Sequence, residues 1–228
     1  MPYIEATNFQ IEFEFLVGGK SDGLNGDGFA VWLTSERAEN GPVFGNRDRF
    51  EGVGIFFDTY ANARQPHSFP YVMAMVGDGK TSYDNNNDGL SNRVGGCEAN
   101  FRGVTTPTKA RITYSASSHA LNLKLHTKAW GQWDDCFTIM DVKLPSHTYL
   151  GFTSHTGEVH DRHDIISVTT SMMSKGENFI GQRRNNAPPP PKKSGFGWYL
   201  KFLAVSAIFI AVIAVAFQMS KKNNMRRF

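Results

Sequence analysis

Short segments in which apolar and polar residues alternate recur through the first 170 residues and constrain the fold more than any other feature. Segment 8–17 alternates along its length, and segments 111–115 and 120–127 repeat the pattern on either side of a short polar turn. A period of two puts every second side chain on the same face of a β-strand. No segment of this region shows a clear helical period or an internal repeat. The region is therefore predicted to be all-β.

Five further apolar segments and four turn motifs complete this pattern. The apolar segments are GFAVWLT, GVGIFFDTY, YVMAMVG, TYLGFTS and DIISVTT, and the turns are GGKSDG, NGDG, GDGK and DNNNDG. Many short antiparallel strands joined by polar loops are typical of a β-sandwich or jelly roll. A region of this length can bury one hydrophobic core, so residues 1–173 are predicted to form a single domain.

Residues 202–219 form an apolar run of 18 residues without charge, in which only Ser206 and Gln218 are polar. A helix rises ~1.5 Å per residue, so this run and its flanks can cross a hydrocarbon core of ~30 Å. The alternative is a buried core helix, but the run is apolar on every face and lies close to the chain end. Residues 198–219 are therefore predicted to be one transmembrane helix.

The charges divide near residue 173. Residues 174–228 hold ten of the 24 basic and one of the 21 acidic residues, which leaves 14 basic and 20 acidic residues, a net charge of −6, before them. An acidic domain argues against a nucleic-acid partner and fits a domain that gathers a cation. Residues 174–197 contain NNAPPPPKKSG, which predicts a polyproline-type stem, and residues 220–228 are expected to be a basic cytosolic tail.

Cys97 and Cys136 are the only cysteines. An even count suits one disulfide in an oxidising lumen, whereas the alternative is two buried thiols in the cytosol. The segment after Met1 has no basic start, apolar stretch or small-residue cleavage site of a secretory signal. Two interpretations remain: the natural N-terminus lies upstream, or the domain is cytosolic and anchored by its tail.

Three loop segments, 26–28, 58–62 and 83–89, hold side chains that can do more than form turns. Calcium takes six to eight oxygen ligands from carboxylates, amides, backbone carbonyls and water. The second and third segments, DTYAN and YDNNNDG, offer such oxygens on loops that follow predicted strands. DNNNDG alone has the composition of an ordinary turn, but together with DTYAN it predicts a calcium site.

Several motifs resemble those of the animal-type leguminous (L-type) lectins. The motifs, which span roughly residues 8–170, are GDGFAVWLTSER, GPVFGNRDRFEGVGIFFDTYAN, FPYVMAMVGDG, SYDNNNDG, GGC and HDIIS. The resemblance implies a concanavalin-like antiparallel β-sandwich, N-terminally truncated because the family's domain begins upstream of Asn8. It also implies a single-pass type I membrane protein of the endoplasmic reticulum (ER), the ER–Golgi intermediate compartment or the Golgi.

The same resemblance implies a calcium site and a mannose site. Asp58, Asn62 and Asp88 match the family's calcium ligands, and Tyr60 supplies its backbone carbonyl, so Ca2+ is the implied cofactor. The implied sugar contacts are Asp27, Tyr60, Asn62, Asn85, Gly157, Glu158 and Val159. Asn62 can give its oxygen to the ion and its NH₂ to a sugar hydroxyl, while Asp27 accepts from hydroxyls. The Tyr60 ring is expected to offer the sugar an apolar face, and the peptide before Asp27 is expected to be cis.

Four positions depart from the family pattern. Asn85 stands where a His beside the second calcium loop is usual, and Glu158-Val159 replaces Asp-Leu. Phe56 occupies the position of a manganese-binding Glu in plant members, so no manganese site is expected.

The implied function is calcium-dependent binding of high-mannose N-glycans on glycoproteins, for transport or quality control between ER and Golgi. A membrane tether that keeps the fold but no longer binds sugar is the alternative, motivated by Asn85. A glycosidase is a further alternative, since Glu12 and Glu14 share one strand face, but it needs two facing carboxylates and no acidic partner strand supports one. No catalytic residues are predicted, and the chain is not expected to be an enzyme.

Two remaining motifs are given simpler interpretations. His155, His160 and His163 form H-x₄-H-x₂-H, which matches no common zinc spacing, so loop hydrogen bonding is expected. The tail KKNNMRRF, which ends in Phe228, resembles the coat-binding export tails of these lectins, and plain stop-transfer charge is the alternative. High-mannose glycoproteins and vesicle coat proteins are thus the expected partners.

Overall fold

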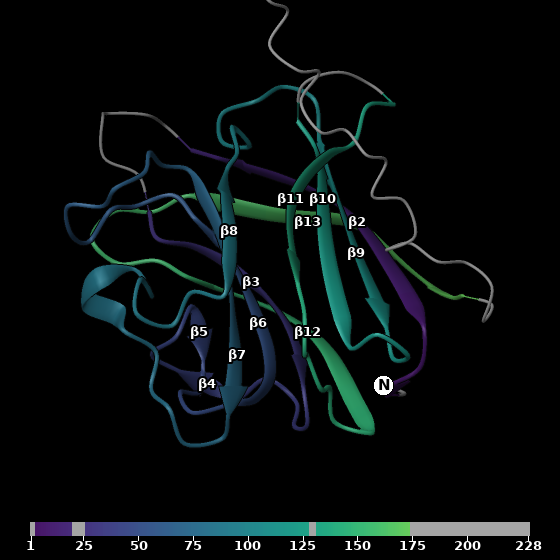
Figure 1. The fold of residues 1–228 in the computed structure, drawn as a ribbon. Helices are drawn as coiled ribbons and strands as arrows, with labels where there is room; N and C mark the ends of the chain where they lie inside the picture. The colour runs from purple at the N-terminus through teal and green to yellow at the C-terminus, as the bar shows by residue number, and fades with distance from the viewer. Residues whose placement is uncertain (1–2, 20–25, 128–130, 174–228) are drawn as a thin grey trace, which may run out of the picture. The chain divides into compact units, whose positions relative to one another are not determined.

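The structure is a computed structural model that describes residues 3–19, 26–127 and 131–173 (Figure 1). The strands are β1 (Ile4–Glu5), β2 (Phe9–Gly18), β3 (Gly28–Thr34), β4 (Asn40–Gly41), β5 (Gly45–Asn46), β6 (Glu51–Asp58), β7 (Tyr71–Asp78), β8 (Gly95–Glu98), β9 (Thr108–Ser115), β10 (Ala120–His126), β11 (Asp134–Ile139), β12 (His147–His155) and β13 (Arg162–Met172). Within these three ranges the single helix is the 3₁₀ turn η1 (Asn85–Asn87). The predicted all-β architecture is confirmed.

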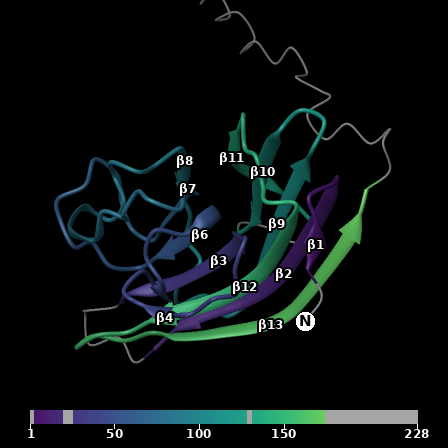
Figure 2. The same ribbon diagram turned by 90° about the horizontal axis from the view of Figure 1, so that it is seen from below.

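Two antiparallel sheets form the domain. The larger has the strand order β1-β12-β3-β6-β7-β8, and the smaller has the order β11-β10-β9-β2-β13. Figures 1 and 2 show β6, β7 and β8 in one layer and β9, β10 and β11 in the other. The predicted antiparallel β-sandwich is therefore confirmed, with strands that are distant in sequence, such as β3 and β12, lying side by side.

The two sheets explain why the apolar segments have two kinds of pattern. Along β2 every second residue is buried, because this strand has one face on the core and one face toward solvent. All seven residues of β3 are buried, because loops cover the outer face of the larger sheet. Trp32 and Phe56 lie on that covered face and contact Phe50 and Tyr83.

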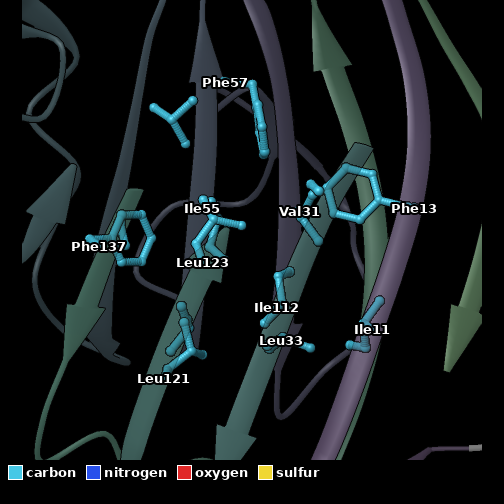
Figure 3. Close-up of a cluster of buried hydrophobic side chains, with 14 of the residues drawn as sticks. Ile11, Phe13, Val31, Leu33, Ile55, Phe57, Ile112, Leu121, Leu123 and Phe137 are labelled. Carbon is cyan, nitrogen blue, oxygen red and sulfur yellow. The ribbon is translucent and has the colours of Figure 1, made fainter. Parts of the chain in front are cut away.

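The main core lies between the sheets (Figure 3). Val31, Ile55 and Phe57 of the larger sheet face Phe13 and Leu123 of the smaller one, and all five are fully buried or nearly so. The Phe57 ring stacks on Phe29 with centroids 4.5 Å apart. This packing fixes the ends of β3 and β6, from which the loops with the predicted site residues emerge.

A disulfide joins the two sheets at one edge. Cys97 of β8 and Cys136 of β11 are bonded, with Cα atoms 5.2 Å apart and a sequence separation of 39. The predicted disulfide is confirmed, and the alternative of two free thiols is wrong. In the chain-entropy model, closing a loop of this length contributes about 4 kcal/mol to stability.

The predicted stem (174–197), transmembrane helix (198–219) and tail (220–228) lie outside the described residues. Among the residues that the structure does describe, no helix has the length and hydropathy needed to span a membrane.

Candidate functional site

Sheet register brings the first site residues together at one end of the larger sheet. Gly28, the first residue of β3, is paired with Asp58 on β6 and with His155 on β12. Asp27, which immediately precedes Gly28, therefore lies between the Asp58 and His155 strand ends. The Gly26–Asp27 peptide is cis, as the resemblance implies.

The loop that contains η1 completes the cluster. The backbone N–H of Asn62 donates to both carboxylate oxygens of Asp88 at 3.1 Å, and Asn62 Nδ2 donates to Asp88 Oδ1 at 2.6 Å. Gln65 Nε2 donates to Asp88 Oδ2 at 2.9 Å. Segments 58–62 and 83–89, which the sequence singled out separately, thus meet in the folded domain.

Two buried carboxylates dominate the electrostatics of this cluster. Asp58 is 4% exposed and Asp88 is 6% exposed, and neither forms an ion pair with a basic side chain of the described part of the chain. Burial raises the pKa of Asp58 well above its ordinary value, and the nearby Asp88 and Asp27 charges add to this effect. Buried charges of one sign are costly unless a counter-charge compensates them, so the site favours a bound cation.

Tyr83 is a further buried polar residue of this site. Its hydroxyl is buried and has no hydrogen-bond partner among the residues described here. Burial raises the pKa of Tyr83, and the charges of Asp58 and Asp88 raise it further, so the hydroxyl remains protonated. Its ring lies against Phe56, with centroids 4.8 Å apart.

The ligand types fit calcium. The predicted set comprises the carboxylates of Asp58 and Asp88, the amide of Asn62 and the carbonyl of Tyr60. Within the described ranges no group of three or more His, Cys, Asp or Glu side chains is placed to hold a metal, so any ion here depends on amide and backbone oxygens. Such neutral oxygens with two carboxylates suit a hard cation such as Ca2+.

The orientation of Asn62 differs from the expected one. Its NH₂ was expected to face a sugar hydroxyl, but it donates to Asp88. A carboxylate can only accept hydrogen bonds, and the buried Asp88 therefore attracts the donor end of the nearest amide.

A pocket of about 170 Å³ lies beside these carboxylates. Its lining residues are Asp27, Pro42, Phe44, Asp58, Asn62, Tyr83, Asn85 and His155. The structure thus brings Asp27, Asn62 and Asn85, three of the predicted sugar contacts, to one cavity.

The other predicted sugar contacts, Tyr60, Gly157, Glu158 and Val159, do not line this pocket. A Cβ atom added to Gly157 would be 3.9 Å from Asp27 Oδ2, and one added to Gly26 would be 2.9 Å from Val159 and 3.1 Å from Tyr60. Glu158, the remaining predicted contact, is exposed on this loop. The Tyr60 side chain lies against Gly26, and the aromatic rings that line the pocket are those of Phe44 and Tyr83.

Sequence reasoning assigned no site role to Pro42, Phe44, Tyr83 and His155. The first two lie in GPVFGN, a segment that contributed to the family resemblance, and Tyr83 begins the predicted calcium loop. His155 was considered only within a histidine-rich loop. Its place in the pocket follows from the pairing of β12 with β3, for which no local signal exists.

A buried ion pair connects the loops that form the site. The Asp161 carboxylate is fully buried and accepts two hydrogen bonds from Arg102 Nε, at 2.9 and 3.0 Å, and one from Arg102 Nη2 at 2.8 Å. Thr59 Oγ1 donates to Asp161 Oδ2 at 2.9 Å, and the Asp161 N–H donates to the Gly26 carbonyl at 2.7 Å. We call Arg102, Asp161 and Thr59 the Asp161 clamp; it ties the three loops that contain Asp27, Asp58 and Gly157.

The three histidines of the 155–163 segment have separate environments. His155 contacts Asp27 at 2.7 Å, and His160 is exposed. Burial lowers the pKa of His163, whose Nε2 has no hydrogen-bond partner within the described residues. Only His155 thus belongs to the pocket.

The two glutamates of the glycosidase alternative lie on the solvent side of the smaller sheet. Glu12 pairs with Arg111 of β9 at 2.6 Å, and Glu14 pairs with Lys109 of the same strand at 2.7 Å. These are ordinary cross-strand ion pairs, which supports their interpretation as surface charges.

The pKa of Asp58 predicts how the stability of the metal-free domain varies with pH. A folded-state pKa above the unfolded value of about 3.9 means that the folded state holds the proton more tightly. In EDTA the free energy of unfolding is therefore expected to fall as pH rises through the raised pKa. Urea unfolding over a pH series measures this slope, and Asp58→Asn, which cannot ionise, should flatten it. Equal slopes for the two proteins would contradict the prediction.

Comparisons with known proteins agree with this architecture. A model of the legume-like lectin family matches residues 2–178. A Schizosaccharomyces pombe protein described as L-type lectin-like domain-containing protein C126.08c is 34% identical over 229 residues, covering 97% of this chain and 73% of its own. The mouse VIP36-like protein is 39% identical over 168 residues, 73% of this chain and 48% of its own. The chain thus spans about half the length of the VIP36-like relatives.

Solved structures show the same relationship. The VIP36 exoplasmic/lumenal domain in its Ca2+/Man3GlcNAc-bound form matches with a TM-score of 0.70 and 35% identity, covering 75% of this chain and 72% of that one. Its Ca2+/Man-bound form matches with a TM-score of 0.72 and 36% identity, covering 75% of this chain and 70% of that one. The family match, the relatives and the shared sandwich lead to one conclusion: the chain belongs to the legume-like lectin family.

Proposed function

We propose that residues 1–173 bind high-mannose N-glycans on glycoproteins, and that this binding requires calcium. One observation carries the proposal: Asp58 and Asp88 are buried together without a basic partner in the described residues, beside a pocket lined by Asp27 and Asn85. The forms of VIP36 solved with Ca2+ and mannose ligands support it, because that domain shares this fold and about a third of its residues.

Asp58, Asn62, Asp88 and the Tyr60 carbonyl would hold the calcium ion. When bound, the ion would supply the positive charge that compensates the two buried carboxylates. The protein contributes the rest of the recognition: Asp27 accepts hydrogen bonds from sugar hydroxyls, and the amides of Asn62 and Asn85 can donate or accept. Gly157 lies beside Asp27, and together with Glu158 and Val159 it would contact the sugar at the rim of the pocket.

The size of the pocket suits a single sugar ring. Its volume of about 170 Å³ is below the roughly 300–1,000 Å³ of pockets that enclose drug-sized ligands. The exposed edges of the loops leave room for further residues of a branched glycan outside it. A terminal mannose of a high-mannose glycan is therefore the proposed occupant.

The membrane arrangement is part of the same proposal. The apolar run at 202–219 supports a single anchor over 198–219, with the domain lumenal, the stem at 174–197 and the tail at 220–228 cytosolic. Relatives named vesicular integral-membrane protein VIP36 support a membrane protein of the secretory pathway. Transport or quality control of glycoproteins between ER and Golgi, with vesicle coat proteins as partners of the tail, follows from this placement.

Retention on a glycan panel tests the proposal. The purified full chain in detergent is expected to bind high-mannose glycans in calcium and to lose this binding in EDTA, whereas galactose-terminated glycans serve as the negative control. A folded chain that ignores every mannose glycan in calcium would contradict the proposal. That outcome would favour the membrane tether, with Asn85 as the first position to examine.

A further inference from the structure

His155 contacts the side chain that the proposed function makes central to sugar binding. His155 Nδ1 lies 2.7 Å from Asp27 Oδ2, and both residues line the same pocket. The two are also joined through the backbone, since the Asp27 N–H donates to the His155 carbonyl at 3.3 Å. The His155 side chain is 51% exposed, so the contact leaves much of the ring open to a ligand.

The contact has a defined direction. An ionised carboxylate only accepts hydrogen bonds, so Nδ1 carries the proton and donates to Asp27 Oδ2. No other hydrogen bond to the Asp27 carboxylate comes from the described residues, which leaves Oδ1 available to a ligand. His155 Nε2, on the far side of the ring, forms no hydrogen bond within the described part of the chain, and in the neutral imidazole with its proton on Nδ1 it can accept one from a hydroxyl.

The neighbours of His155 form a set of polar groups suited to several hydroxyls. Asn85 and Asn62 contribute amides to the same lining, while Phe44 and Tyr83 contribute rings. Asp27 Oδ2 already accepts the hydrogen bond from His155, so fewer of the carboxylate's acceptor positions remain for sugar hydroxyls. The imidazole lies beside the same carboxylate and offers a neighbouring hydroxyl a second partner.

We propose that His155 is a specificity-determining residue of the sugar pocket, which holds the Asp27 carboxylate through Nδ1 and binds a second mannose hydroxyl through Nε2. This inference rests on the proposed mannose-binding function. His155 belongs to none of the residues that would hold calcium, so it acts on the sugar and not on the ion.

Substitutions of His155 separate its contact with Asp27 from its contact with the sugar. The Asn side chain places an amide near the Nδ1 position and no group near the Nε2 position. For the full chain in detergent with calcium, His155→Ala is expected to weaken methyl α-mannoside binding about five- to thirtyfold, the equivalent of two hydrogen bonds. His155→Asn should recover part of this loss by holding Asp27. The calcium affinity measured without sugar should stay within about twofold for every variant.

His160→Ala is the matched control, because His160 is exposed on the same segment and does not line the pocket. It should bind methyl α-mannoside as the wild-type chain does.

The four monodeoxy forms of methyl α-mannoside test the direct contact. In the wild-type chain, the form that lacks the hydroxyl bound by His155 should bind about three- to tenfold more weakly than the parent sugar. In His155→Ala and His155→Asn this penalty should disappear, while the penalties of the other three forms remain. A purely structural role would leave all four penalties unchanged, and that result would overturn the inference even if the variants bind more weakly.

The same titrations distinguish failure of the inference from failure of the proposed function. If the folded wild-type chain does not bind methyl α-mannoside or high-mannose glycans in calcium, the proposed function is overturned and this inference with it. If the wild-type chain binds in a calcium-dependent manner and the four penalties are unaffected by His155, only the inference is overturned.

Discussion

Replacing Asp161 with Ala should lower the free energy of unfolding by about 3–5 kcal/mol and remove measurable mannoside binding. The substitution leaves Arg102 largely buried without its carboxylate, and breaking a buried pair in this way typically costs that amount. It also removes one of the two acceptors of Thr59 Oγ1, the other being the Asp27 carbonyl at 3.2 Å, so the loops that contain Asp27 and Asp58 lose their shared contact with Asp161. Urea unfolding in EDTA measures the first effect, and titration with methyl α-mannoside in calcium measures the second.

Two further variants make this prediction specific. Glu12→Gln breaks a partly exposed cross-strand pair with Arg111 and should cost less than about 1 kcal/mol. Combining Asp161→Leu with Arg102→Met removes both charges and should recover much of the lost stability, because the uncompensated charge is gone. This double variant should still bind sugar weakly, since residue 161 no longer accepts a hydrogen bond from Thr59. If Asp161→Ala were as stable as Glu12→Gln, the clamp would not stabilise the domain as argued.

The fold was accessible from the sequence because its signals are local. The period of two in segment 8–17 reports a strand with one solvent face, and β2 has that burial pattern. The continuous run GFAVWLT reports a strand buried on both faces, as β3 is. The even cysteine count suggested one disulfide, and Cys97 and Cys136 are bonded.

The site was accessible only in part, because much of it is assembled by long-range pairing. Asp58 and Asn62 are close in sequence and were found by composition. Asp27 and His155, by contrast, are 128 residues apart and meet only through the register of β3 and β12. Arg102 and Asp161 are 59 residues apart and resemble ordinary loop charges until the structure shows them buried. Side-chain direction was equally inaccessible: the sequence did not indicate that the rings of Phe44 and Tyr83 line the pocket.

Replacing Asn62 with Ala should abolish glycan retention while the fold persists. Asn62 is exposed, so its removal creates no cavity, and Asp88 keeps the Gln65 side-chain donor and backbone donors. The variant should therefore unfold in EDTA with a free energy within about 0.5 kcal/mol of the wild-type value. In calcium the two proteins should differ strongly: an ion at 100 times its dissociation constant stabilises the folded state by about 2.7 kcal/mol, and the variant should gain little at the same concentration.

Asn86→Ala provides the control for this loss, since Asn86 is an exposed amide of the neighbouring loop that does not line the pocket. It should keep both the calcium stabilisation and retention on high-mannose glycans. Asn62→Ala, by contrast, should bind glycans at least a hundredfold more weakly, because one amide serves the ion and borders the sugar. Undiminished, EDTA-sensitive retention of Asn62→Ala would place the calcium and sugar sites elsewhere in the chain. A different outcome would identify a calcium-binding tether. In that case calcium stabilises the wild-type chain and not Asn62→Ala, but the wild-type chain retains no glycan.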